Sequence, residues 1–303
     1  MRILVGALLL AATAFAVQQQ AQPDPLIREN ATVKVAEHVY VIPDFNVGAV
    51  PNVGIIVGSR ATLVVDTGLG RKNGETVLRE VNKVSKNTEV YVVSTHFHAE
   101  HALGESAFPA AKVIRVRAQQ RDMDEFGITP NFAGRSPVAA DLLKDAAYRK
   151  ADEFFDTEKI LDLGGVRVRL MWHGAATHTN GDTLIFIEGD GVLFAGDIIM
   201  NRRYLAFNAA SSSVQAWINT IEKVAPLRPS RVVPSHGEMG DGALVQQNLT
   251  YLRDLQTRAA ALKREGKTAD EASQSITNEL RAKYPNWTGN PTAAARSAYT
   301  EAK

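Results

Sequence analysis

Short runs of β-branched and apolar residues, separated by Pro, Gly and Asn, follow one another after residue 30. They predict successive strands at residues 33–42, 53–57 and 62–65. Residues 74–84 then carry apolar side chains at helical spacing, and residues 90–93 form a fully apolar strand. This strand leads directly into a cluster of histidines. Because chemistry tends to lie on loops that follow strands, this junction is the first candidate for a functional site.

A second β-rich half follows a polar interruption. Residues 111–116 predict a strand, whereas the charged stretch 119–155 predicts helices inserted near one face. The remaining pattern predicts strands at 159–163, 166–172, 183–187, 192–194 and 231–233, a helix at 214–224, and two helices within 245–280 that join near Gly266. Residues 284–303, rich in Pro, Asn, Gly and Ala, are expected to fray.

Two halves that each run from strands to helices predict the fold class. We expect an α+β protein in which two sheets pack face to face with helices outside, a four-layered αββα sandwich with additional C-terminal helices. The expected domain spans residues 31–250, and residues 251–303 form a C-terminal helical extension.

The N-terminus resembles an export signal. Residues 1–16 place a short apolar run after Arg2 and end in Ala14-Phe15-Ala16, a small-x-small cleavage pattern. The run is too short to span a bilayer, so no membrane anchor is expected after cleavage. Residues 17–30 are rich in Gln and Pro and are expected to form a flexible leader. The sequence therefore predicts a periplasmic or secreted protein.

Composition narrows the chemistry. Loss of residues 1–16 removes Arg2 from the 34 basic residues, so the remainder balances the 33 acidic ones and no nucleic-acid partner is implied. The chain has no cysteine, which excludes disulfides, a thiolate nucleophile and thiolate metal ligands. Any catalytic metal must therefore be held by histidines and carboxylates.

Residues 94–101, Ser-Thr-His-Phe-His-Ala-Glu-His, place three imidazoles and a carboxylate directly after the apolar strand. Alternate residues of extended backbone face the same side, so His96 and His98 can converge on one ion. Glu100 and His101 can then reach a second point nearby. Two adjacent metal ions are thus geometrically possible.

Three further ionisable residues follow or flank predicted strands of the second half: His178, Asp197 and His236. Burying such groups is costly unless they are paired or bind a metal, so their common position needs a common explanation. Five of the seven histidines belong to the combined set. The other two, His38 and His173, match no ligand position and are expected to be surface or packing residues.

At this point the ordered series resembles the metallo-β-lactamase superfamily, whose pattern is His-x-His-x-Asp-His, then a His, an Asp after Gly, and a His before Gly. The resemblance covers residues 31–250. It implies two zinc ions per chain, the first held by His96, His98 and His178. The second would be held by Glu100, His101 and His236, with Asp197 as the bridge. Asp66 resembles the buried aspartate that braces the histidine loop.

Glu100 departs from the pattern, because the family has Asp there. Its extra methylene moves the carboxylate by about 1.5 Å, whereas ligand distances tolerate only about 0.2 Å. The loop must therefore adjust, or the second metal ion binds more weakly. The resemblance also makes Glu100 and Asp197 the candidate catalytic carboxylates.

The resemblance implies a hydrolase in which metal-activated hydroxide cleaves an amide or ester-type bond of a small molecule. A β-lactam is the leading substrate, because export places the protein where those compounds act. A lactone or a thioester is the alternative that the Asp197 bridge favours. From other classes, a mononuclear iron persulfide dioxygenase and an inactive metal-binding module remain open, as does the oligomeric state. Arg202, Arg203 and Tyr204 could bind a substrate carboxylate or oxyanion.

Overall fold

A computed structural model describes residues 23–128, 132–174, 176–208 and 212–303. The expected signal peptide, residues 1–16, and the first part of the expected leader, residues 17–22, lie outside these residues. None of the helices in the described ranges is long and apolar enough to span a membrane.

The first sheet is built in chain order. Its seven described strands are β1 (Val33–Lys34), β2 (Val39–Ile42), β3 (Val53–Val57), β4 (Ala61–Val65), β5 (Glu89–Val93), β6 (Lys112–Val116) and β7 (Glu153–Phe155). Strands β1 to β4 are antiparallel, and β4 to β7 are parallel. Parallel neighbours need crossover connections, which α1 (Gly70–Val84), α2 (Ala99–Ala102), η1 (Leu103–Ala107), α3 (Arg117–Phe126) and α4 (Pro137–Leu143) provide. Within the expected helical insertion, β7 is an unpredicted strand that extends this sheet.

The second sheet has six described strands in the order β13-β12-β11-β10-β9-β8. They are β8 (Glu158–Asp162), β9 (Arg167–Met171), β10 (Leu184–Ile187), β11 (Val192–Gly196), β12 (Arg231–Pro234) and β13 (Gly240–Asp241). Only β11 and β12 pair in parallel among these strands. Helix α5 (Val214–Val224) and the short η3 (Ala225–Leu227) connect this parallel pair.

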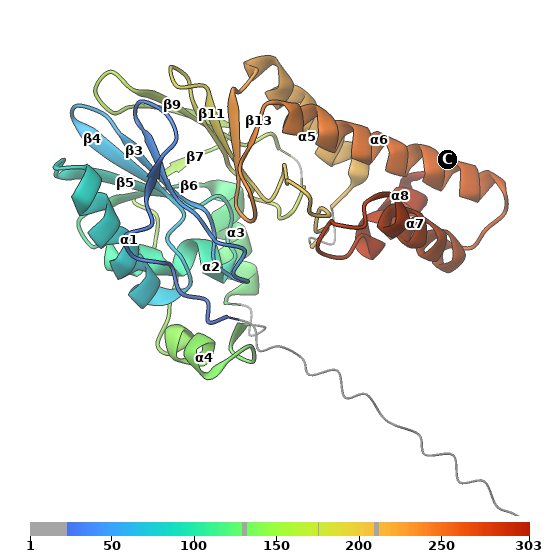
Figure 1. The fold of residues 1–303 in the computed structure, drawn as a ribbon, viewed down its shortest axis with the longest axis horizontal. Helices are drawn as coiled ribbons and strands as arrows, with labels where there is room; N and C mark the ends of the chain where they lie inside the picture. Colours follow the sequence, from blue (N-terminus) through green and yellow to red (C-terminus); the bar gives the residue numbers. More distant parts are fainter. Residues whose placement is uncertain (1–22, 129–131, 175, 209–211) are drawn as a thin grey trace, which may run out of the picture.

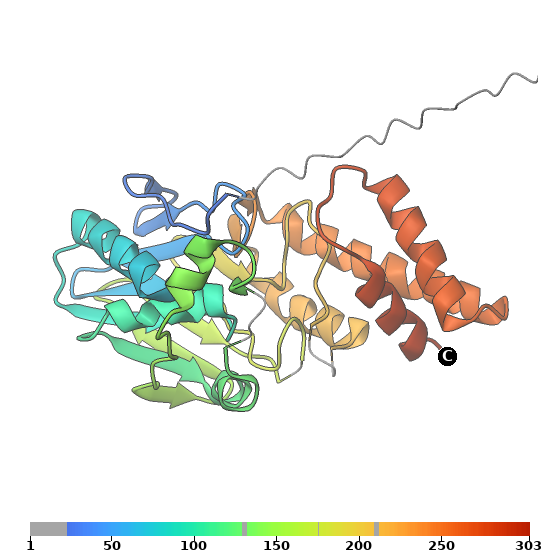
Figure 2. The same cartoon turned by 90° about the horizontal axis from the view of Figure 1, so that it is seen from below.

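Apolar side chains fill three successive layers. One cluster joins the two sheets, with Leu63 and Val65 of β4 packed together with Ile185 and Phe194 of the second sheet. A second cluster joins the first sheet to α1, and a third joins the second sheet to α5 and the C-terminal helices. Figures 1 and 2 show α1 to α4 on one side of the sheets and α5 to α8 on the other. The predicted four-layered αββα sandwich is confirmed.

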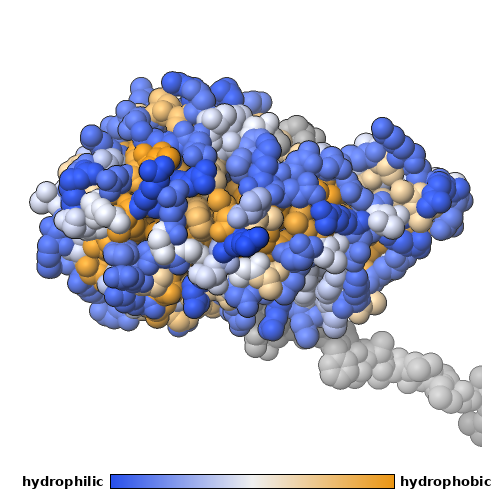
Figure 3. Space-filling view, turned by 90° about the horizontal axis from the view of Figure 1, so that it is seen from above, coloured by the Kyte–Doolittle hydropathy of each residue, from blue (hydrophilic) through white to orange (hydrophobic). Residues whose placement is uncertain are grey.

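The C-terminal extension is more ordered than predicted. Helices α6 (Ala243–Arg264), α7 (Ala269–Lys283) and α8 (Thr292–Glu301) pack together, so the boundary expected after residue 250 falls inside α6. The prediction that residues 284–303 fray is wrong, because α8 buries Ala294, Ala295 and Ala298 against its neighbours. Small alanine side chains allow this close helix approach. Hydrophilic residues cover most of the face drawn in Figure 3, including the outer end of these helices.

The described part of the expected flexible leader is docked on α1. The backbone amide of Ile27 donates to Asn73 Oδ1 at 2.9 Å, and Asn73 Nδ2 donates to the Pro25 carbonyl at 2.8 Å. The Asn30 amide donates to Glu80 at 2.8 Å. Asn73 and Glu80 are buried polar groups that need partners. The leader supplies them, so residues 24–30 are held in place and differ from the expectation.

Candidate metal centre

The predicted site residues come from four chain segments that meet at one edge of the sandwich. His96 and His98 follow the carboxyl end of β5, and His178 lies in the loop between β9 and β10. Asp197 follows β11 and His236 follows β12. Because β11 and β12 are parallel, their carboxyl ends lie at the same edge of the second sheet. Packing of the two sheets then brings this edge to the end of β5.

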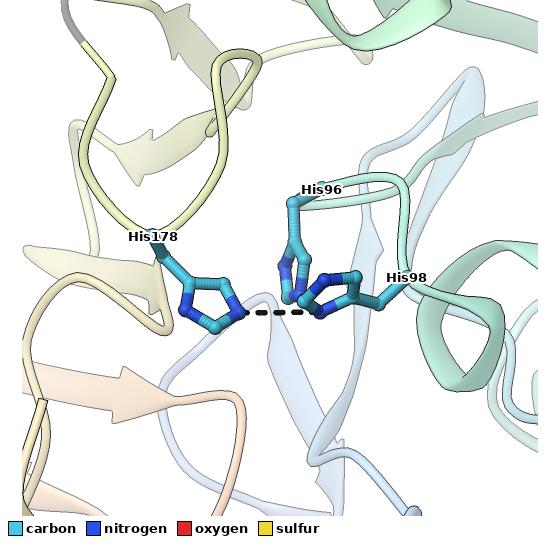
Figure 4. Close-up of side chains that lie close together, drawn as sticks. All are labelled: His96, His98 and His178. Atoms are coloured by element: carbon cyan, nitrogen blue, oxygen red, sulfur yellow. Dashed lines mark hydrogen bonds between the residues drawn. The ribbon is translucent and has the colours of Figure 1, made fainter. Parts of the chain in front are cut away.

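The imidazoles of His96, His98 and His178 point toward one another (Figure 4), and their candidate ligand nitrogens lie within 4.8 Å of each other. His98 Nδ1 is 2.9 Å from His96 Nε2 and 3.2 Å from His178 Nε2. Three nitrogens bound tetrahedrally to zinc at the usual bond length would lie roughly 3.3 Å apart. The observed spacing therefore fits one metal ion held by these three rings.

A second group, Glu100, His101 and His236, gathers beside the first with its ligand atoms within 4.8 Å of one another. Asp197 lies next to the first group, with Oδ2 3.3 Å from His178 Nε2. Within the described residues, three buried atoms here have no hydrogen-bond partner: Glu100 Oε2, His101 Nε2 and Asp197 Oδ1. Buried polar atoms are normally paired, so this shared deficit fits one or more cations.

Hydrogen bonds on the far side of the rings orient them. His178 Nδ1 lies 2.8 Å from the Ala206 carbonyl, and His236 Nδ1 lies 2.9 Å from the Val50 carbonyl. A carbonyl only accepts, so both Nδ1 atoms carry the proton and both Nε2 atoms keep a lone pair for a metal.

Asp66 is hydrogen-bonded to the histidine loop. Its carboxylate accepts hydrogen bonds from the Thr95 amide at 2.7 Å and the Thr95 hydroxyl at 3.1 Å. The same carboxylate lies 2.9 Å from His101 Nδ1. Asp66 sits at the end of β4 with a positive φ of 61°, a conformation that short polar side chains tolerate. The contacts connect the two parallel strands β4 and β5 directly to the site.

The electrostatics suit metal ligation. Burial, together with the neighbouring imidazoles, lowers the pKa of His96 and His98 well below the ordinary value. Burial favours the neutral acid of Asp197, but His178 and His236 outweigh it and lower the pKa of that carboxyl. For His101, burial is again opposed, and Asp66 raises its pKa to about 9. Apart from His101, these groups already have the neutral-imidazole and ionised-carboxylate states that metal binding requires.

The centre opens into a cavity of about 890 Å³. Its lining includes the aromatic side chains of Phe97, Phe126 and Phe132 together with Arg203. Phe126, at the end of α3, is 50% exposed and contacts the ring of Phe97 at a centroid distance of 5.8 Å. The cavity therefore offers both an apolar wall and a cationic group beside the metal ligands.

Only one of the three predicted substrate contacts reaches this cavity. Arg203 does, whereas the Arg202 side chain is 71% exposed and its nearest ionic partner is Glu238 at 3.9 Å. The prediction for Tyr204 is wrong, because its ring is buried and its hydroxyl donates to the Leu280 carbonyl at 3.0 Å. The same carbonyl near the end of α7 also accepts from the Tyr284 amide at 2.8 Å, so the Tyr204 hydroxyl is its second donor.

Two supporting arrangements were not predicted. The Asn52 amide donates to the Pro234 carbonyl at 2.9 Å and to the Gly237 carbonyl at 2.8 Å, which holds the backbone on both sides of His236. Beneath the histidine loop, Arg115 and Glu105 form a fully buried ion pair of 2.6 Å. An arginine inside the apolar strand β6 was the available signal, because a buried charge requires a partner.

Comparison with known proteins places these observations in a family. A family model described as "Metallo-beta-lactamase superfamily" matches residues 47–236, more than half of the chain. A "Metallo-beta-lactamase type 2" of Bacillus sp. (strain 170) is 24% identical over 264 residues, 82% of this chain and 95% of that protein. Another of the same name from Bacillus cereus is 24% identical over 213 residues, 69% of this chain and 76% of that protein.

Solved structures show the same fold. The metallo-beta-lactamase from Pontibacter korlensis has a TM-score of 0.59 at 19% identity, covering 73% of this chain and 98% of that one. A double mutant of the sec-alkyl sulfatase PisA1 has a TM-score of 0.65 at 18% identity, covering 89% of this chain and 50% of that one.

Proposed function

Because the chain belongs to the metallo-β-lactamase superfamily and is a hydrolytic enzyme, we propose that it binds two zinc ions and opens the ring of a β-lactam. The observation that carries the proposal is the pair of ligand groups, His96–His98–His178 and Glu100–His101–His236. Glu100, His101 and the adjacent Asp197 each have a buried atom that finds no hydrogen-bond partner in the described part of the chain. Zinc with such ligands lowers the pKa of a bound water to about 7, which supplies hydroxide near neutral pH.

The residues of the site would have two tasks, to hold the metal ions and to orient the attacking water. In this proposal the three imidazoles of the first group would hold one ion, and the second group would hold the other. Asp197 Oδ2 lies 3.3 Å from His178 Nε2, and its Oδ1 has no partner among the residues that the structure describes, so the carboxylate would be free to contact both positions. Its lowered pKa keeps it ionised at neutral pH. Asp197 Oδ1 and Glu100 Oε2 can then accept hydrogen bonds from the attacking water and orient it.

The cavity supports a substrate with an anionic and an apolar part. Arg203 can form a paired hydrogen bond with a carboxylate, and the lining residues Phe97, Phe126 and Phe132 offer rings that can contact an apolar side chain. β-Lactam antibiotics commonly combine these two features around the reactive amide. A lactone or a thioester with the same features is the alternative substrate, because all three compounds present a carbonyl carbon to an activated water.

Elemental analysis combined with a substrate panel tests the proposal. We expect about two zinc ions per chain and hydrolysis of a penicillin, a cephalosporin or a carbapenem, measured by loss of ring absorbance. Parallel assays use a γ-lactone and an acyl thioester. Turnover of one of these alone would move the substrate to the alternative. Iron with oxygen consumption, or zinc without any turnover, would contradict the proposal.

Variants locate the activity. We expect His178→Ala to lose zinc and turnover together, because it removes a ligand from the first group. His173→Ala is the matched control, since this imidazole lies in the same loop but is absent from both ligand groups. Turnover that survives in His178→Ala would show that the site is misassigned.

We also propose that the chain is exported to the periplasm or secreted after cleavage near residue 16. The apolar run and the Ala14-Phe15-Ala16 pattern support this. The intact mass of the mature protein, purified from the extracytoplasmic fraction, tests it. A mass that includes residues 1–16 would contradict the proposal.

A further inference from the structure

Residues 202–208 form a cavity-side segment that depends on the C-terminal extension. Arg203 and Ala206 line the cavity, and the Ala206 carbonyl accepts the hydrogen bond from His178 Nδ1 at 2.8 Å. This carbonyl therefore fixes both the tautomer and the ring orientation of one candidate metal ligand.

The start of this segment is tied to Thr288, in the connection between α7 and α8. The Tyr204 amide donates to the Thr288 carbonyl at 3.0 Å, and the Thr288 amide donates to the Arg202 carbonyl at 3.1 Å. These bonds form a β-bridge between Arg203 and Thr288. The buried Tyr204 ring adds packing against Trp287, with a centroid distance of 5.4 Å. Arg203 is thus placed by the extension, although it contacts the cavity of the catalytic domain.

A second attachment lies beyond residues 209–211, at the start of α5. Glu301, the last residue of α8, accepts hydrogen bonds from the amides of Val214 at 2.7 Å and Gln215 at 3.0 Å. The Ser297 hydroxyl donates to the Ser212 carbonyl at 3.2 Å and to Glu301 Oε1 at 2.8 Å. The α8 helix therefore holds the N-terminal turn of α5, whose free amides favour an anionic partner.

Ser212 carries this attachment back to the metal centre. Its hydroxyl donates to the carbonyl of Thr177, the residue that precedes His178. His178 is thus held from two directions, at its ring by Ala206 and at its backbone by Ser212. Both contacts belong to segments that the C-terminal helices fix, through Thr288 and through Ser297 and Glu301.

We propose that residues 284–301 are a positioning element of the metal centre, in which Thr288 and Glu301 hold the segments that orient His178. The inference rests on the proposed zinc site. It gives the extension a role in metal affinity that is separate from its contribution to the hydrophobic core. None of these residues touches the metal ligands' donor atoms, so they act only through Ala206 and Ser212.

Glu301→Ala is the first test, with Glu279→Ala as the matched control. Glu279 is a glutamate on the neighbouring α7 that pairs with Arg258 at 2.8 Å, within the extension and away from the 212–215 segment. The full-length metal-free proteins are titrated with zinc against a chromophoric chelator. Cobalt(II) replaces zinc in a parallel sample, and its visible absorption reports the ligand geometry of the first group.

We expect Glu301→Ala to lower the zinc affinity of the first ligand group about tenfold and to change the cobalt spectrum. The melting temperature of the metal-free protein should fall by only about 2–4 °C. Glu279→Ala should lose similar stability and keep the zinc affinity and spectrum of the unmodified chain. Glu301→Gln retains one acceptor oxygen, so it should restore most of the affinity. Ser297→Ala, which removes a single hydroxyl, should also lower the zinc affinity. It replaces Glu301→Ala as the test if that variant fails to fold.

Unchanged zinc affinity and an unchanged cobalt spectrum in both Glu301→Ala and Ser297→Ala would overturn the inference. Equal losses in Glu301→Ala and Glu279→Ala would also overturn it, because the effect would then follow general stability. Failure of the unmodified chain to bind zinc would instead overturn the metal centre itself, and the inference with it.

Discussion

Replacement of Asp66 by Asn tests how the buried support of the histidine loop controls the second ligand group. The Asp66 carboxylate is 1% exposed and faces His101 Nδ1 at 2.9 Å. Asn has nearly the same shape, so it can still accept from the Thr95 amide. Its NH₂ group, however, would face a protonated His101 Nδ1. The ring then has to move its proton to Nε2, the atom that the proposed zinc ion requires.

Two effects of this change can be given a magnitude: a loss of metal affinity and a loss of folding stability. Loss of a carboxylate that orients a ligating imidazole typically costs about 10- to 100-fold in metal affinity, and we expect that loss at the Glu100–His101–His236 group. In the metal-free protein, burial opposes protonation of His101, but Asp66 raises its pKa from the ordinary 6.5 to about 9. This shift corresponds to up to about 3 kcal/mol of folding stability.

The sign of the pH dependence follows from the raised pKa. A histidine whose folded pKa exceeds its unfolded value stabilises the fold fully below pH 6.5, and this stabilisation disappears as the pH rises through about 9. Urea unfolding of the metal-free protein at several values between these limits measures it. The stability difference between the unmodified chain and Asp66→Asn should shrink across that window.

Asp190→Asn is the control, because Asp190 contacts His38 Nδ1 at 3.1 Å, a similar Asp–His pair outside both ligand groups. It should leave both zinc ions bound as in the unmodified chain. If Asp66→Asn also kept full zinc content and an unchanged pH dependence, Asp66 would not be the group that controls His101.

Four further changes test other parts of the site and its supports. Phe126→Ala should lower kcat/KM about three- to tenfold for substrates with an aromatic side chain and leave it unchanged for substrates without one. Phe45→Ala, which lies outside the cavity, should change kcat/KM for neither class. Tyr204→Phe should lower the free energy of unfolding, measured by urea titration, by about 1 kcal/mol and leave KM unchanged. A raised KM would show that Tyr204 contacts the substrate after all. Glu100→Asp should keep the fold and change the zinc stoichiometry or kcat; identical values would mean that the loop absorbs the methylene. Glu105→Gln should lower the free energy of unfolding by about 3–5 kcal/mol, measured by thermal unfolding, because it leaves the buried Arg115 without its ionic partner. A loss below about 1 kcal/mol would show that this ion pair does not stabilise the fold.

Local pattern was sufficient for most of the elements. The prediction of β3 at residues 53–57 and α5 at 214–224 matches the structure, because each depends on periodicity within a few turns or residues. The predicted break near Gly266 separates α6 from α7. The short strand β7 was not predicted, since it is defined by pairing with β6 and carries little pattern of its own.

The sequence by itself determined which groups could bind a metal: an absence of cysteine, a dense histidine cluster after an apolar strand, and three more ionisable residues beside later strands. Tertiary structure decided where the neighbouring side chains go. In the folded protein Tyr204 points into the core and Arg203 lines the cavity. The C-terminal segment, which composition suggested would fray, forms the packed helix α8. The physical reason is range. Periodicity and turn chemistry act over a few residues, whereas the Tyr204–Leu280, Arg203–Thr288 and Val214–Glu301 contacts join residues 76 to 87 positions apart. Only packing of the layers sets which of them meet.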